Sequence, residues 1–121
     1  MSRFVIMITM ALGLALSAAG SAQAADDAKQ VFDFYCAQCH GEKGDGKGIN
    51  VTKSFSTDPR NFTVTADMEK RSDDDIRTVI KDGGPAISKS PLMPPWGATL
   101  SDAEVDGLLA HIRKLCKCTA K

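Results

Sequence analysis

The sequence has no excess of charge of either sign. Its 15 lysine and arginine residues are matched by 15 aspartate and glutamate residues, so no overall field attracts nucleic acid. Beyond residue 24 it has no internal repeat and no segment with the alternation of a β-strand. No catalytic base or nucleophile stands out either. These absences favour an all-α chain that is not an enzyme.

Long hydrophobic runs are missing except at the N-terminus. Arg3 precedes an apolar run from Phe4 to Ala19, and Ala22-Gln23-Ala24 supplies small residues for cleavage. The run is shorter than the roughly 20 apolar residues of a confident membrane span, although a retained N-terminal anchor is the alternative. We therefore expect residues 1–24 to be a cleaved signal peptide. The mature chain, residues 25–121, is then one exported domain with no membrane span.

The sequence has four cysteines, and an exported protein commits its thiols to bonds or metals. Two of the four cysteines lie in Cys36-Ala37-Gln38-Cys39-His40. This C-x-x-C-H spacing lets two sulfurs on one short piece of backbone reach both vinyl groups of one haem, and the following histidine binds its iron. The motif predicts covalent haem c.

Glycines recur from Gly41 to Gly48, directly after the motif. No strand precedes them and no Gly-Lys-Ser/Thr follows, so a phosphate-binding loop is disfavoured. We expect a backbone that turns tightly beside the haem edge.

Apolar spacing predicts helices over residues 26–39, 72–82 and 101–115. Ser72 with Asp75, and Ser101 with Glu104, have the spacing of capping boxes. Residues 49–65 and 85–99 have little helical period and are expected to be loops.

A second axial ligand has three candidates beyond the signal peptide. Met93 lies in Met93-Pro94-Pro95, where two prolines stiffen the backbone beside it. Met68 lies in a charged stretch and is expected to pack or to be exposed, and His111 lies at the edge of an apolar helix face. Met93 is favoured, although core packing is the ordinary role of such a methionine.

The helix ending in Cys36–Gly41, the later Met93-Pro94-Pro95 and the capped last helix ending in His111–Leu115 resemble the small class I cytochromes c of bacteria. The resemblance spans residues 25–115. It implies an all-α cytochrome c fold in which the first and last helices cross at one covalently bound haem.

The same resemblance implies roles for individual residues. Cys36 and Cys39 would form the thioether bonds, and His40 and Met93 would be the axial ligands. Three further residues are expected in the haem surroundings. Pro59 would accept the Nδ1–H of the histidine through its carbonyl, Trp96 would close the haem edge or belong to the core, and Arg60 would pair with a propionate or remain a surface charge.

One departure from that family is Cys116-Lys117-Cys118, near the end of the chain. No histidine follows it, so it holds no second haem. A strained disulfide, a bond to another protein and metal binding all remain open.

The expected function is a periplasmic monohaem electron carrier that meets its redox donor and acceptor transiently. One alternative is a structural zinc protein in which Cys36, Cys39, Cys116 and Cys118 supply four thiolates. Another is a haem sensor or enzyme whose sixth coordination position is open.

Overall fold

The computed structural model describes residues 27–120, and every regular element in that range is helical. The predicted signal peptide, residues 1–24, lies outside the described residues. The elements in chain order are a helical segment at 27–31, the π-helical turn η1 (Phe32–Cys36), α2 (Ala37–His40), α3 (Thr65–Met68), α4 (Asp73–Asp82), the 3₁₀ turn η2 (Gly84–Ile87) and α5 (Asp102–Cys116).

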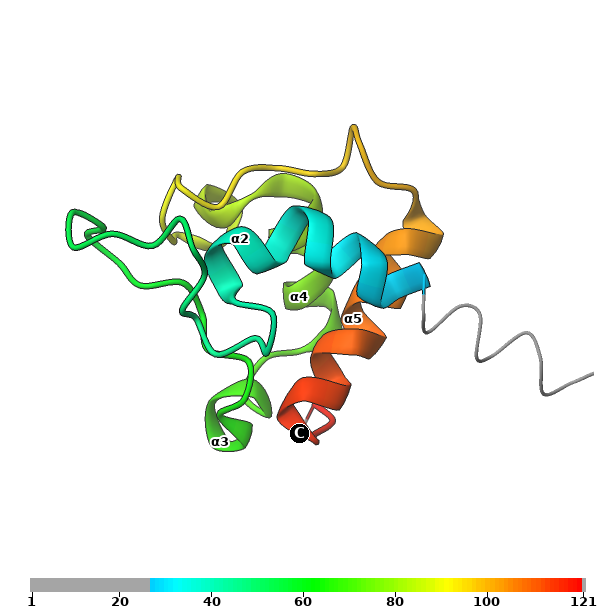
Figure 1. Cartoon of the computed structure of the whole chain (residues 1–121). Coiled ribbons are helices and arrows are strands. Elements are labelled where there is room, and N and C mark those ends of the chain that lie inside the picture. The colour runs from blue at the N-terminus through cyan, green and yellow to red at the C-terminus, as the bar shows by residue number, and fades with distance from the viewer. Residues whose placement is uncertain (1–26, 121) are drawn as a thin grey trace, which may run out of the picture.

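The first three of these elements follow one another without a break and form one helix over residues 27–40 (Figure 1). This confirms the helix expected near the motif. The π-helical turn inside it was not predicted. The helix ends at Gly41, whose φ of 79° is open to glycine at little cost.

Both predicted capping boxes are formed. The Ser72 side chain accepts from the Asp75 amide at 3.0 Å, and the Asp75 carboxylate accepts from the Ser72 amide at 3.2 Å. Ser101 and Glu104 make the same reciprocal pair at the start of α5. These bonds satisfy amide donors that have no partner inside the helix, which is why α4 and α5 begin where the sequence indicates.

The two predicted loops are confirmed except at one end of each, where a short helical turn is present. Residues 49–64 contain turns and bends but no helix, and the single turn α3 then begins at Thr65. The turn η2 begins just after α4 ends at Gly83, so the predicted loop over 85–99 opens with a 3₁₀ turn.

The core forms where the first helix crosses α5 (Figure 1). The two backbones approach at Ala28 and Gly107, because a Cβ added to Gly107 would lie 3.2 Å from the Ala28 Cβ. Phe32 is fully buried next to this crossing. The other buried apolar side chains come mainly from α4 and α5: Ile76, Ile80, Leu100, Val105, Leu108, Leu109 and Ile112.

Ion pairs link α4 to α5 on the surface. Arg77 reaches Asp106 at 2.7 Å, and Lys81 reaches Asp102 at 2.8 Å. Pairs as exposed as these contribute little, because solvent and salt screen them. The apolar faces between the helices therefore carry most of this contact.

His111 lies on α5 against the first helix. Its ring centroid is 4.8 Å from that of Phe32. Its Nε2 is buried without a hydrogen-bond partner, as is Oδ1 of Asp33. Burial lowers the pKa of His111 below its ordinary value, and the nearby Asp33 charge opposes that shift. The neutral imidazole is therefore the form that the fold favours.

We expect His111 to make stability fall in mild acid. Its pKa is lower in the folded chain than the unperturbed value of about 6.5, so the unfolded chain binds the proton more readily. Stability is fully present above that value and declines as the pH falls toward the folded-state pKa. Urea unfolding of wild type and His111→Gln between pH 8 and pH 5 measures this. The wild type should lose more stability than the variant below about pH 6.5, and parallel pH curves would contradict the prediction.

Candidate cofactor site

The C-x-x-C-H motif spans the junction between η1 and α2. Cys36 is the last residue of η1, and Cys39 and His40 lie at the end of α2. Both cysteines are half-buried and bonded to no other cysteine. Together with His40 they line one large cavity.

The glycine-rich loop holds the end of this helix. The last carbonyls of a helix have no hydrogen-bond donor inside it. Here the backbone amides that follow the helix donate to them. The bonds are Gly46 to His40 at 2.8 Å, Gly48 to Cys39 at 3.0 Å and Asn50 to Gln38 at 2.8 Å. A Cβ on Gly48 would lie 2.3 Å from the Gln38 carbonyl oxygen. The expected tight turn is thus present, and it fixes the backbone of the motif.

His40 is oriented by two neighbours. Its Nδ1 lies 3.0 Å from the Arg60 carbonyl oxygen, and its ring stacks on Phe62 with the centroids 4.5 Å apart. A carbonyl only accepts, so Nδ1 carries the proton and the lone pair is on Nε2. Burial lowers the pKa of His40, which the bond to Arg60 partly opposes. The neutral ring is therefore favoured, with a fixed tautomer.

The prediction that the Pro59 carbonyl accepts this proton was wrong, because the acceptor is the carbonyl of the next residue, Arg60. The Pro59 oxygen faces Gly46 instead, since a Cβ on Gly46 would lie 2.7 Å from it. Arg60 therefore contributes its backbone to His40. Its side chain is exposed and lies 3.9 Å from the Asp67 carboxylate.

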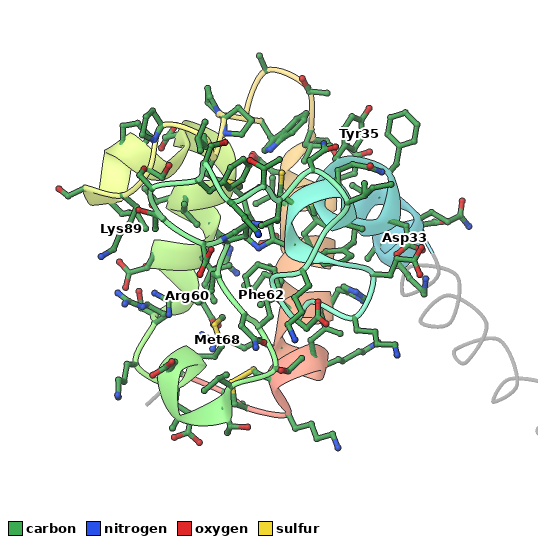
Figure 2. All side chains as sticks on the ribbon, turned by 60° about the vertical axis from the view of Figure 1, so that its left-hand side comes forward. Asp33, Tyr35, Arg60, Phe62, Met68 and Lys89 are labelled. Carbon is green, nitrogen blue, oxygen red and sulfur yellow. A yellow bond between two sulfur atoms is a disulfide. The ribbon has the colours of Figure 1, made fainter. Side chains whose placement is uncertain are left out.

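The cavity beside the motif has a volume of about 810 Å³, within the range of about 300–1,000 Å³ typical of cofactor and ligand sites. Its lining is mostly apolar and includes Phe62 and Met68, which lie close to Arg60 in Figure 2. Arg71 and Lys89 add two further cations. An apolar pocket with a few cations suits a large, flat, apolar group that carries carboxylates.

Met93 also lines this cavity. Its loop is attached to the end of α4: the Gly84 amide donates to the Met93 carbonyl at 2.9 Å, and the Trp96 amide to the Ile80 carbonyl at 3.0 Å. A Cβ on Gly84 would lie 2.1 Å from the Ser90 oxygen. The two glycines after α4 therefore let the loop pack closely, and the loop brings Met93 to the same cavity as His40.

The structure also places the other predicted residues. Trp96 lines the cavity and packs against Tyr35, with the ring centroids 5.0 Å apart. Met68 is buried, which agrees with the packing role expected as one of its two alternatives, and it lines the cavity too. His111 is not among the lining residues.

The alternative of a zinc site made of four cysteine thiolates is wrong. Cys116 and Cys118 are bonded to each other. Within residues 27–120, no three histidine, cysteine or acidic side chains are grouped as a metal site requires. The thiolates that zinc would need are not brought together.

The surroundings of Cys36 also argue against a redox dithiol. Burial, together with the nearby Cys39, raises the pKa of Cys36 to about 12. Reactive dithiols depend on a lowered thiol pKa. The two sulfurs suit covalent attachment better than thiol exchange.

Comparison with protein families gives independent evidence on the cofactor. Residues 23–112, about three quarters of the chain, match the family described as cytochrome C oxidase, cbb3-type, subunit III. The chain belongs to this family. A search of curated proteins finds no match.

Membership in the family makes the chain a small c-type cytochrome domain with an all-α cytochrome c fold. Such domains bind haem c covalently and transfer electrons. Among the described residues, no helix is both long and apolar enough to span a membrane.

Replacing Gly48 by alanine should weaken the site. The added methyl group would overlap the Gln38 carbonyl, so the loop or the helix end must move, at a cost of roughly 1–3 kcal/mol. Urea unfolding of the haem-loaded protein measures this. Ile49→Ala is the matched control, because the neighbouring Ile49 is 86% exposed. If both variants lose the same small amount of stability, the tight contact at Gly48 does not matter.

Proposed function

We propose that this protein is an exported, monohaem, His/Met-ligated cytochrome c that carries single electrons between protein partners. The observation that carries the proposal is the convergence of Cys36, Cys39, His40 and Met93 on one cavity. These residues come from two separate parts of the chain, and they are the complete donor set of such a cytochrome.

The residues fit the cofactor in named roles. Cys36 and Cys39 would hold it through thioether bonds. His40 would bind iron through Nε2, the nitrogen left free by the bond to Arg60. Met93 would supply a second ligand through its sulfur. When bound, haem supplies an iron that alternates between ferrous and ferric states.

The chain sets the conditions for that change of charge. A thioether ligand stabilises ferrous iron relative to a nitrogen ligand and so raises the reduction potential. The Arg60 carbonyl and the Phe62 ring fix the orientation of His40, and fixed ligands limit reorganisation. With haem bound, the apolar lining would exclude water, and Arg71 and Lys89, with Arg60, would provide cations for the propionates.

Location and partners belong to the same proposal. Residues 1–24 would be the signal peptide, and residues 25–121 the mature periplasmic domain. The donor and acceptor would be redox proteins that dock transiently, through the small interfaces usual for such encounters. No residue is assigned to substrate chemistry, so the protein would not be an enzyme.

A pyridine haemochrome assay on exported protein, made with the haem-attachment machinery, tests the proposal. We expect one haem per chain, retained in acidified organic solvent because the two thioether bonds are covalent. Colourless protein, or pigment that is extracted into the solvent, would contradict the proposal. Cys36→Ala together with Cys39→Ala should abolish the retained pigment.

Two matched substitutions test the sixth ligand. Met93→Leu and Met68→Leu each remove a sulfur from the cavity at nearly constant volume. Met93→Leu should lose the low-spin spectrum and lower the reduction potential on the order of 0.1 V, within the roughly 0.8 V that axial ligands span.

Met68→Leu should keep both the spectrum and the potential. An unchanged Met93→Leu spectrum would show that another residue binds the iron or that the sixth position is open, as in the sensor or enzyme alternative. Loss of ligation in Met68→Leu alone would assign that role to Met68.

A further inference from the structure

A disulfide between Cys116 and Cys118 closes the end of α5, with Lys117 as the only residue between them. Figure 2 draws it at the lower edge of the molecule, beside α3. The family match ends at residue 112. Nothing in the proposed haem chemistry uses this pair.

The bond does little to hold the fold together. A disulfide restricts the unfolded chain more as the loop it closes grows longer, and this loop is the shortest but one that two cysteines can close. It joins no second element to α5. Other contacts already attach this turn, including the Thr65 hydroxyl that donates to the Cys116 carbonyl at 2.7 Å. A contribution to the stability of the fold therefore does not explain why the pair is present.

The two sulfurs have very different surroundings. Cys116 is 1% exposed and belongs to the core, whereas Cys118 is only half-buried. A thiol from another protein therefore reaches Cys118 first.

A fixed positive charge lies beside the accessible sulfur. Nη1 of Arg113 is 3.6 Å from Sγ of Cys118. The guanidinium is held by the Asp73 carboxylate at 2.7 Å and by the Arg71 carbonyl at 2.7 Å. A cation in this position stabilises a thiolate on Cys118 once the disulfide is opened.

The buried sulfur favours the protonated form instead. Sγ of Cys116 lies 3.3 Å from the Arg113 carbonyl oxygen, at the C-terminus of α5. The partial negative charge at a helix C-terminus disfavours a thiolate there, while a thiol would donate to that carbonyl. The opened pair would thus consist of a half-buried thiolate and a buried thiol.

We propose that Cys116 and Cys118 form a thiol–disulfide exchange site that accepts two electrons from a dithiol protein, with Cys118 as the sulfur that is attacked. A partner thiolate bonds to Sγ of Cys118, and the Cys116 sulfur leaves and takes up a proton. The partner's second thiolate then attacks the partner's first sulfur in the mixed disulfide. The Cys118 sulfur leaves as a thiolate beside Arg113. The partner ends as a disulfide and the pair as a dithiol. This site goes beyond the proposed electron transfer and does not rest on it.

Single-cysteine variants of the haem-loaded protein test the proposal. Cys116→Ser leaves Cys118, and Cys118→Ser leaves Cys116, while Cys36 and Cys39 are taken up by haem. The neutral disulfide probe dithiodipyridine reports the reaction of each remaining thiol. We expect the Cys118 thiol to react about tenfold faster or more at neutral pH.

The wild-type protein supplies a second, independent measurement. Equilibrated with mixtures of reduced and oxidised glutathione, the pair should change from disulfide to dithiol as the ratio rises, as a thiol-labelling gel shift would show. Structural disulfides in exported proteins resist the glutathione pool. A pair that stays oxidised at every ratio, or variants whose two thiols react equally fast, would overturn the proposal.

Discussion

The site depends on how the first helix ends. Its last three carbonyls accept from amides of the glycine-rich loop and of Asn50 just after it, and this fixes the direction in which the chain leaves Gly41. The same loop then receives the next segment, because the Phe62 amide donates to the Gly44 carbonyl at 2.7 Å. Phe62 and the Arg60 carbonyl reach His40 as a result. One set of backbone hydrogen bonds thus orients the histidine, with no side-chain network needed.

The two sides of the cavity have separate supports. The histidine side is built by the first helix and the loops that follow it. The methionine side is a loop attached to the C-terminal end of α4 through Gly84 and Trp96. These supports meet in the packed core around Phe32, where the first helix crosses α5, and through the contact between Tyr35 and Trp96. The distance between the two candidate ligands is therefore set by the packing of the helices.

Local sequence signals predicted the helix starts well. Contacts between residues far apart in the sequence were predicted less well. The boxes at Ser72 and Ser101 placed two helix starts correctly, because a capping residue and its partner lie within one turn. The histidine acceptor was predicted one residue early, at Pro59 in place of Arg60, since rotating a peptide unit changes which carbonyl points inward. Phe62 was missed as the partner of His40 because ring stacking across a loop leaves no periodic signal. The roles of individual residues toward haem remain predictions.

The π-helical turn at Phe32–Cys36 sets the phase between the two halves of the first helix. A π turn holds one residue more than the α-helical turn it replaces, and each residue of an α-helix corresponds to about 100° of rotation. The first half therefore directs Ala28 toward Gly107, while the second half directs Cys39 and His40 into the cavity. An engineer who copied this motif onto a straight α-helix of equal length would turn the haem-binding residues out of register with the core.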